Sequence, residues 1–334
     1  MQLLANEAPE IRQHLITTSI GAQALGGQNF LSSLIIFEKR GYGLKAFRKV
    51  KKEIESQINK QNDTRTKNNC LILQPHKSFR SSLLARYLAY PTITFNESSL
   101  SSLAEITVPR VAVLHEAHRI GLLLEPLGLS RNKIVESRPI LHSNGASVII
   151  EISKEFESHE NENFIGIAPG SVWETKRWPL EHFAALVNVI FTNIPNSKIV
   201  LLGSYAEKAI AQSILEQVKP NSNIVSLAGS TNLQDLLWIV PRLKMMICND
   251  SSLLHYASAF NIPSLGIFGA TIPAMGFGPL ANHSQTAELQ NLECRPCSDH
   301  GPKVCPLQHF KCMRELSINS VATLAKDVFY AAYE

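Results

Sequence analysis

The 334-residue sequence lacks several features that would place it in a specialised class of protein. It has no apolar run of the roughly 18 residues that span a bilayer, and residues 1–10 show neither the basic nor the apolar region of a secretory signal. Hydrophobic residues make up 45% and charged residues 18% of the chain, which excludes disorder, collagen and a disulfide-stapled miniprotein. These absences predict a globular cytoplasmic protein whose six cysteines are reduced.

Positive charge is concentrated in the first half of the chain. Residues 1–145 carry 19 Lys and Arg against 11 Asp and Glu, a net +8, whereas residues 146–334 carry 13 against 17, a net −4. A basic half favours an anionic partner such as phosphorylated lipid, a membrane surface or nucleic acid. No stacking aromatics are interleaved with these basic residues, so we expect no nucleic-acid partner. The alternative is that the basic run at 45–52 is only the solvated face of a helix.

Short β-rich runs alternate with longer helical patterns, which predicts parallel sheets with crossover helices. In the first half, the predicted strands are 14–19, 33–37, 70–74, 92–95 and 110–114, and the clearest predicted helices are 41–61 and 78–89. In the second half, the predicted strands are 164–168, 198–202, 223–227, 245–248 and 264–268, with helices from 178 and over 206–217.

The length fits two domains of about 150 residues each. The polar and acidic segment 141–162 predicts the boundary between a domain at 1–150 and a domain at 160–334. The fold class is therefore α/β, with two doubly wound, Rossmann-like domains. Ligands of such sheets bind outside the carboxyl ends of the strands, so the turns that follow the strands are where we expect a site.

The first polar turn, 170–179, follows the predicted strand at 164–168. It offers the hydroxyl of Ser171 and the cation of Lys176 just ahead of a helix N-terminus. Backbone N–H groups and the helix dipole favour phosphate at such a place, and the lysine adds a point charge. The alternative is a loop whose cations face water.

The second polar turn follows the predicted strand at 245–248, where Asp250 or Ser251 can cap a helix. The first backbone N–H groups of that helix have no partner within it and point above the strand end. They belong to Ser251, Ser252 and Leu253. A pyrophosphate fits this arrangement. His255 lies one turn into the helix, where it either touches the same anion or is structural.

Two further turns carry polar side chains. Glu207 stands at a helix start, where it either accepts from ribose hydroxyls or merely caps the helix. Gly269 and Thr271 follow the predicted strand at 264–268. Four such turns in consecutive units of one domain predict a site for a nucleotide diphosphate.

These residues together resemble glycosyltransferase family 9, the ADP-heptose:lipopolysaccharide heptosyltransferases. The segments that carry the resemblance are 170–179, 249–255, 268–273 and the tail that begins at 294–297. The resemblance covers most of the chain and is strongest over 164–315. It implies a GT-B architecture of two Rossmann-like domains facing a cleft, with a final helix over 318–333 that packs back across the domain junction.

The resemblance also implies roles for single residues. In the C-terminal domain, the resemblance implies that Ser171 and Lys176 bind the donor phosphates and that Glu207 binds the ribose. The residues implied at the diphosphate and sugar are Asp250, Ser251, Ser252, Leu253 and His255, with Gly269 and Thr271 beside them. The family usually has Gly where Ser252 stands, so Ser weakens the site if that residue needs a positive φ. In the N-terminal domain, Lys77 and Arg80 resemble acceptor-binding residues for carboxylate or phosphate groups, or they are solvated cations at a helix start.

The family begins with a buried strand and a Gly-Asp loop that supplies the general base, and this chain has no Gly-Asp dipeptide. We therefore expect the first strand and the base to be missing, so that no catalytic residue is assigned. Either the gene model starts too late or activity is reduced, since a missing base costs about 10²–10⁴-fold in rate. A missing central strand leaves two neighbouring strands with unpaired edges.

The implied reaction is a single inverting transfer of heptose from ADP-heptose to the lipopolysaccharide inner core, the Kdo/heptose-lipid A acceptor. It needs no cofactor or metal, because Lys176 and the helix after Asp250 stabilise the departing diphosphate. The implied location is the cytoplasm, with peripheral contact to the inner membrane of a Gram-negative bacterium. The alternative is a non-catalytic nucleotide-sugar-binding protein derived from the same fold.

The cysteine tail allows three interpretations. Its thiols are Cys294, Cys297, Cys305 and Cys312, with His300 and His309 between them. They offer enough ligands for one structural zinc ion, although only the first pair has standard zinc spacing. Free thiols or disulfides are the alternatives.

Overall fold

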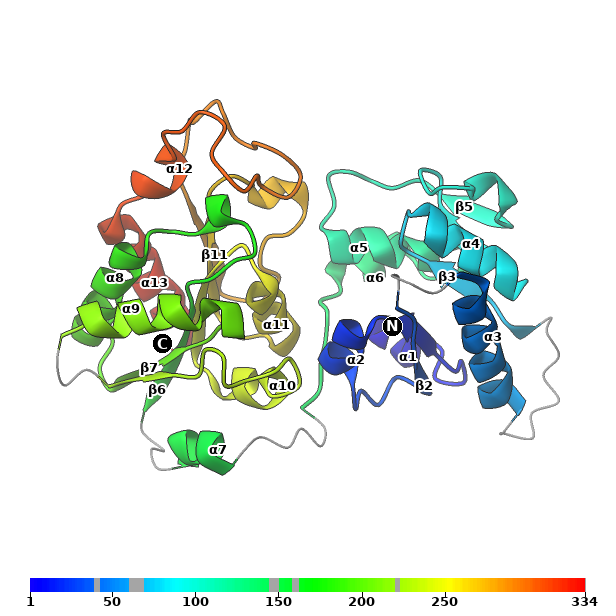
Figure 1. The fold of residues 1–334 in the computed structure, drawn as a ribbon, viewed down its shortest axis with the longest axis horizontal. Helices are drawn as coiled ribbons and strands as arrows, with labels where there is room; N and C mark the ends of the chain where they lie inside the picture. Colours follow the sequence, from blue (N-terminus) through cyan, green and yellow to red (C-terminus); the bar gives the residue numbers. More distant parts are fainter. Residues whose placement is uncertain (39–42, 60–68, 144–149, 158–161, 220–222, 334) are drawn as a thin grey trace. The chain divides into compact units, whose positions relative to one another are not determined.

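The computed structural model describes the whole chain except residues 39–42, 60–68, 144–149, 158–161, 220–222 and 334. The chain forms two compact units, Met1–Ser137 and Arg138–Glu334 (Figure 1). This division precedes the predicted boundary segment 141–162, part of which lies outside the described residues. The reason is that Arg138 already belongs to the second unit, because its Nη1 donates to the carbonyls of Ser258 at 2.8 Å and Ala259 at 3.0 Å.

The strands of the N-terminal unit form two parallel sheets. They are β1 (His14–Thr17) paired with β2 (Ser33–Ile36), and β3 (Ile72–Gln74), β4 (Thr92–Phe95) and β5 (Ile106–Val108) paired in that order. The doubly wound sheet predicted here is thus divided in two among the described residues. Partly buried Ile16 of β1 and Ile72 of β3 pack against one apolar cluster that includes Ile35 and Phe37, so the two sheets share part of their core.

Four of the five strands predicted in this unit are confirmed, and the one at 110–114 is wrong. The strand lies earlier, at β5, and the carbonyls of Val111 and Ala112 accept hydrogen bonds from the buried side chain of Arg119. Because these carbonyls are bound to a side chain, they do not accept the backbone hydrogen bonds that would make 110–114 a strand.

Both helices that the sequence predicts in this unit are present, as α3 (Gly43–Asn59) and α4 (Phe79–Leu88). The outer ends of the predicted range 41–61 lie outside the described residues. Ser78 caps α4 by accepting from the N–H of Ser81, and Ala89 ends it in a left-handed conformation. The shorter helices are α1 (Gln2–Glu7), α2 (Ser19–Leu25), α5 (Glu116–Gly121), α6 (Arg131–Glu136) and the 3₁₀ segments η2 (Ser101–Leu103) and η3 (Leu122–Leu127).

The C-terminal unit contains one six-stranded, fully parallel sheet in the order β11-β10-β9-β6-β7-β8. Its strands are β6 (Asn163–Ala168), β7 (Ser197–Leu201), β8 (Ile224–Ser226), β9 (Met245–Asn249), β10 (Ser264–Phe268) and β11 (Ser284–Glu288). Counted from β6, this is the Rossmann strand order, in which the chain reverses direction across the sheet between β6 and β9. All five predicted strands are confirmed, whereas the polar edge strand β11 was not predicted.

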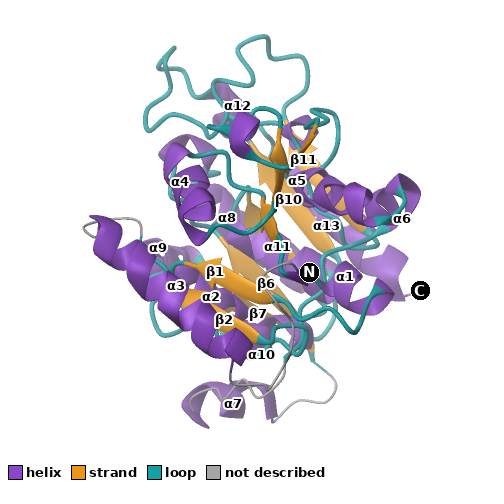
Figure 2. Cartoon of the chain, turned by 90° about the vertical axis from the view of Figure 1, so that its right-hand side faces the viewer, coloured by secondary structure: helices purple, strands orange, loops and turns teal. Residues whose placement is uncertain are grey.

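Helices cover both faces of this sheet (Figure 1, Figure 2). Figure 1 shows α8, α9 and α13 on one side of the sheet and α10 and α11 on the other. The helices are α7 (Ile150–Glu157), α8 (Leu180–Asn193), α9 (Lys208–Gln217), α10 (Leu236–Ile239), α11 (Ser252–Phe260), α12 (Lys311–Arg314) and α13 (Ile318–Tyr333). The predicted final helix is confirmed as α13, which packs on α8 beside β10 and β11. Its packing across the domain junction stays a prediction. None of the described helices has the length and apolar character that crossing a membrane requires.

Candidate functional site

The point where the strand order reverses lies between β6 and β9, and Asn249 joins the turns that follow these two strands. This residue ends β9 and is fully buried. Its side-chain NH₂ donates to the carbonyl of Pro169 at 2.7 Å, and its Oδ1 accepts from the N–H of Trp178 at 3.1 Å. The polar residue at the strand end was visible in the sequence, but its role in holding the two turns together was not.

A buried ionic cluster occupies the carboxyl ends of these strands. The Nζ atom of Lys176 lies 2.6 Å from Oδ2 of Asp250, with only 12% and 9% of the two side chains exposed. The hydroxyl of Thr271, which is 3% exposed, donates to the same oxygen at 2.7 Å. The structure thus brings together three predicted site residues from the turns after β6, β9 and β10. In this cluster the carboxylate neutralises the ammonium group and holds it in one position.

The N-terminus of α11 lies directly after Asp250. Ser251 is its N-cap residue in an extended conformation, and its side chain makes no capping hydrogen bond. Ser252 begins the helix and does not have a positive φ, so serine carries no backbone strain where the family usually has glycine. Leu253, in the first turn of the helix, is buried. The backbone N–H groups of this turn are therefore not satisfied by a side-chain cap, as in anion-binding helix termini.

His255 lies on α11 one turn after Asp250. Part of the residue reaches solvent, but the surrounding protein desolvates the ring and lowers its pKa from the usual value. Asp250 opposes this shift, and Lys176 adds to it. The imidazole is consequently biased toward its neutral form, and an anion bound nearby would raise its pKa again.

Ser171 and Glu207 lie in the turns after β6 and β7. Ser171 is 6% exposed, and its carbonyl accepts from Nε of Arg177 at 2.8 Å. Glu207 accepts from the N–H and the hydroxyl of Ser204, at 2.7 and 2.8 Å, and so caps the 3₁₀ helix η5 (Tyr205–Glu207). A Cβ at Gly170 would lie 2.0 Å from Oε1 of Glu207, so the two turns are in contact. The capping role is confirmed, and the ribose contact stays a prediction.

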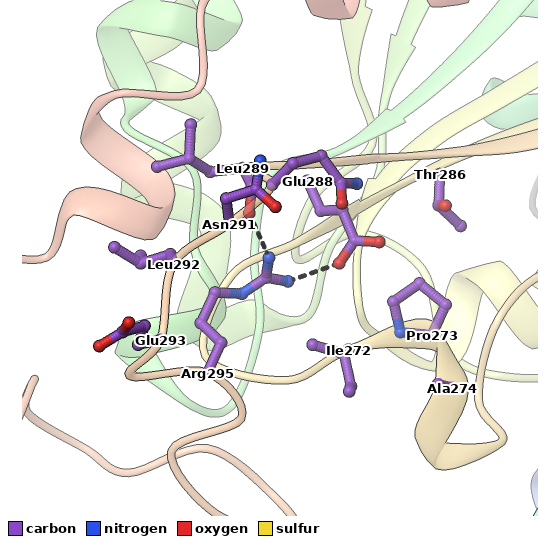
Figure 3. Close-up of a pocket in the computed structure, with 11 residues that line it drawn as sticks. Ile272, Pro273, Ala274, Thr286, Glu288, Leu289, Asn291, Leu292, Glu293 and Arg295 are labelled. Atoms are coloured by element: carbon purple, nitrogen blue, oxygen red, sulfur yellow. Dashed lines mark hydrogen bonds and ion pairs between the residues drawn. The ribbon is translucent and has the colours of Figure 1, made fainter.

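Gly269 and the neighbouring backbone are enclosed by residues that sequence reasoning missed. A Cβ at Gly269 would lie 2.6 Å from the Cε atom of Met313, so glycine is needed here for packing. The carbonyl of Gly269 accepts from Nε of Arg295, whose guanidinium also reaches Glu288 and the carbonyl of Leu289 (Figure 3). These last residues border a hollow of about 710 Å³ beside the turn. The donors and acceptors lie in segments far apart in the sequence, so spacing alone did not indicate them.

The two predicted acceptor residues lie at the start of α4 in the N-terminal unit. Lys77 and Arg80 are both exposed on either side of the Ser78 N-cap. Phe79 between them is 56% exposed. Exposed cations at a helix start fit either an anionic acceptor or solvent, so their role stays a prediction.

All six cysteines have free thiols. In the tail, Sγ of Cys294 lies 3.9 Å from Nε2 of His309, and the thiol of Cys297 donates to the carbonyl of Cys294 at 3.3 Å. Burial raises the pKa of Cys312 to about 11. In the described part of the chain, no three His, Cys, Asp or Glu side chains are grouped to hold a metal ion. Zinc binding by Cys294, Cys297, Cys305 and Cys312 stays a prediction.

Comparison with known proteins links this chain to one family. The sequence model described as Glycosyltransferase family 9 (heptosyltransferase) matches residues 65–308. The lipooligosaccharide heptosyltransferase 2 of Campylobacter jejuni (serotype O:2) is 28% identical over 168 residues, 49% of this chain and 50% of that protein. The lipopolysaccharide heptosyltransferase 2 of Escherichia coli K12 is 29% identical over 132 residues, 39% of this chain and 37% of that protein. The matched region thus spans about half the length of the first of these relatives.

Solved structures share the fold over nearly the whole chain. A glycosyltransferase family 9 protein from Veillonella parvula superposes with a TM-score of 0.78 at 20% identity, covering 99% of this chain and 92% of its own. The E. coli ADP-heptose lps heptosyltransferase II superposes with a TM-score of 0.71 at 19% identity, covering 100% and 94%. The fold is therefore the GT-B fold, built from two Rossmann-like units. With the family match extending from 65 to 308, the chain belongs to glycosyltransferase family 9.

Proposed function

We propose that this protein transfers heptose from ADP-heptose to the inner core of lipopolysaccharide. The observation that carries the proposal is the buried cluster of Lys176, Asp250 and Thr271 beside the N-terminus of α11. It lies where doubly wound sheets bind nucleotides. The names of the relatives support heptose and lipopolysaccharide as substrates, and one structural neighbour, E. coli WaaC, was solved with ADP.

In this proposal the donor diphosphate binds between the ammonium group of Lys176 and the first N–H groups of α11. Ser171 and Thr271 contribute hydroxyls from the adjoining turns, and Glu207 faces the ribose. Lys176 is already paired with Asp250, so the lysine is held in place rather than free to rotate. A preorganised cation costs less side-chain entropy when the ligand binds.

The proposed chemistry is a single inverting displacement at the anomeric carbon of the heptose. The acceptor oxygen forms the new glycosidic bond and its hydroxyl proton passes to water, since no residue of the chain is assigned as the general base. The bond to the diphosphate breaks, and negative charge grows on the departing ADP. Lys176 and the dipole of α11 stabilise that charge. Because these groups supply the positive charge, we expect turnover to be unchanged after treatment with EDTA; a loss that Mg²⁺ restores would contradict this.

The acceptor is proposed to bind through the N-terminal unit at the surface of the membrane. Exposed basic residues lie along α3, whose first turn carries the 64% exposed Leu44, and the 56% exposed Phe79 lies at the start of α4. The basic residues of α3 that are exposed are Lys45, Arg48, Lys49 and Lys52. Basic and apolar side chains on one unit favour an anionic lipid surface. Sedimentation with vesicles tests this: phosphatidylglycerol vesicles should retain the protein, and phosphatidylcholine vesicles should not.

Calorimetric titration of ADP and ADP-heptose, with UDP and GDP for comparison, tests the donor site. We expect preferential binding of the adenine nucleotides. Lys176→Ala should weaken ADP binding by about tenfold or more, since it removes a charge-assisted contact. Asp250→Ala should also weaken it, because Lys176 then loses the carboxylate that holds it in place. Lys326→Ala, at an exposed position on α13, is the matched control and should leave ADP binding unchanged.

The titration has two other informative outcomes. Unchanged ADP affinity in both site variants would overturn the donor site. Binding of ADP-heptose by a protein that transfers no heptose to a defined acceptor would instead support the non-catalytic nucleotide-sugar-binding protein.

A further inference from the structure

Arg295 lies outside the cluster of donor residues but is bound to the turn that supplies one of them. Only 5% of its side chain is exposed. Its Nη2 donates to the carbonyl of Thr271 at 2.9 Å and its Nε to the carbonyl of Gly269. On the other side, Nη1 donates to the carbonyl of Leu289 at 2.7 Å, and Glu288 neutralises the guanidinium at 2.8 Å (Figure 3). A single side chain thus joins the end of β11 to the turn after β10.

The chain that follows Arg295 contacts the same two turns. The N–H of Cys297 donates to the carbonyl of Ala270 at 2.8 Å. Further on, the hydroxyl of Thr175 donates to the carbonyl of Pro302. Gly301 has a φ of +79°, and a Cβ there would lie 3.3 Å from Cγ and Cε of Lys176. Segment 295–302 therefore packs on both the turn that carries Thr271 and the turn that carries Lys176.

The contacts of Thr271 connect Arg295 to the ionic cluster. The carbonyl of Thr271 is held by Arg295, and its hydroxyl donates to Asp250 at 2.7 Å. Arg295 therefore holds the backbone of Thr271, and Asp250 holds its side chain. Loss of the guanidinium would release the carbonyls of Gly269 and Thr271, so the hydroxyl would no longer be held at the carboxylate that pairs with Lys176. A buried guanidinium with planar, directed donors suits this task, and lysine cannot reproduce it.

We propose that Arg295 is a positioning residue of the donor site, which holds Thr271 against Asp250 and thereby fixes the carboxylate that orients Lys176. This inference rests on the proposed function, because it assumes that a nucleoside diphosphate binds at Lys176. It assigns the segment after β11 to support of the donor site, in addition to any role of its cysteines.

Calorimetric titration of ADP into the full-length Arg295→Ala variant tests the proposal. The dissociation constant should rise by about tenfold, which corresponds to the loss of one hydrogen bond to a charged group. Millimolar guanidinium chloride, compared with equal sodium chloride, should restore part of the affinity, and Arg295→Lys should be only partly defective. Arg138→Ala is the matched control: it also removes a guanidinium that binds backbone carbonyls of this unit, at the other end of α11. It should lower the melting temperature without changing ADP binding.

A double-mutant cycle with Thr271→Val separates positioning from general stability. If Arg295 acts through Thr271, the effects of the two changes on ADP affinity are not additive. Additive effects, or an unchanged affinity in a folded Arg295→Ala protein, would overturn the inference. If Arg295→Ala does not fold, the same cycle is run with Arg295→Lys. The proposed function fails separately, because a folded wild-type chain that does not bind ADP contradicts it before any variant is made.

Discussion

The Nζ atom of Lys176 lies 2.6 Å from Oδ2 of Asp250, although 74 residues separate the two in the chain. Both side chains are largely buried, and Thr271 donates to the same carboxylate oxygen. The contact joins the turns after β6 and β9. The pair is therefore part of the proposed donor site and also stabilises the C-terminal unit.

Breaking this pair from one side should destabilise the C-terminal unit. Lys176→Met leaves a buried carboxylate without its cation, and we expect the free energy of unfolding to fall by about 3 kcal/mol. Adding Asp250→Asn should recover part of this loss, because the uncompensated charge is then removed. Urea unfolding followed by tryptophan fluorescence measures the C-terminal unit alone, since Trp173, Trp178 and Trp238 all lie in it. Strictly additive losses would contradict a direct coupling.

ADP binding should be linked to protonation of His255. Desolvation and Lys176 lower its pKa in the free protein, against the opposing effect of Asp250. A bound diphosphate raises the pKa of a nearby imidazole, so the complex takes up a fraction of a proton near the usual pKa of about 6.5 and none at about pH 8. Affinity should accordingly increase as the pH falls through this range.

Calorimetry in buffers of different ionisation enthalpy counts these protons directly. The uptake should disappear in His255→Gln. An uptake that persists in this variant would place the titrating group elsewhere.

Replacing Gly170 with alanine should disturb two turns at once. The new Cβ would lie 2.0 Å from Oε1 of Glu207, so the glutamate must move and the cap on Ser204 is lost. We expect about 1 kcal/mol of destabilisation from the lost cap together with weaker ADP binding. Gly43→Ala is the control, because nothing lies within 4 Å of the position of its Cβ. Equal behaviour of the two variants in thermal unfolding and ADP titration would sink this prediction.

Two of the six thiols should react slowly with alkylating agents. Burial raises the pKa of Cys312 to about 11, and the pKa of the fully buried Cys248 is also raised, chiefly by burial. Because the thiolate is the reactive form, little of either thiol is reactive at pH 8. Mass spectrometry of the native protein after brief iodoacetamide treatment should find Cys294 and Cys305 modified before these two. Early modification of Cys248 would contradict its burial in β9.

Much of the C-terminal unit could be predicted from the sequence because its signals are local. Strands β6, β7, β9 and β10 are short, largely apolar runs in the sequence, and nearly all of their residues are buried in the structure. The polar residues after them mark the carboxyl edge of the sheet, where Ser171, Lys176 and Asp250 were expected and where they lie. Strand β11 was missed because an edge strand of sequence SQTAE has no apolar pattern to reveal it.

The N-terminal unit shows where local signals were insufficient. The run at 110–114 is apolar and β-branched enough to predict a strand, yet Arg119 binds the carbonyls of Val111 and Ala112. That contact depends on how α5 packs, which no short window of sequence contains. The division of the sheet between β1–β2 and β3–β5 is also a property of strand pairing rather than of any one strand.

The sequence by itself determined which turns are polar, which strands are apolar and which family the chain resembles. Each of these properties depends on short segments of consecutive residues. Only the tertiary structure decided what the polar groups do to one another. It pairs Lys176 with Asp250, makes Glu207 a helix cap and brings the guanidinium of Arg295 to the carbonyl of Thr271. The physical reason is that a hydrogen bond or ion pair needs two atoms within about 3 Å, and the fold alone sets the distance between residues far apart in the chain.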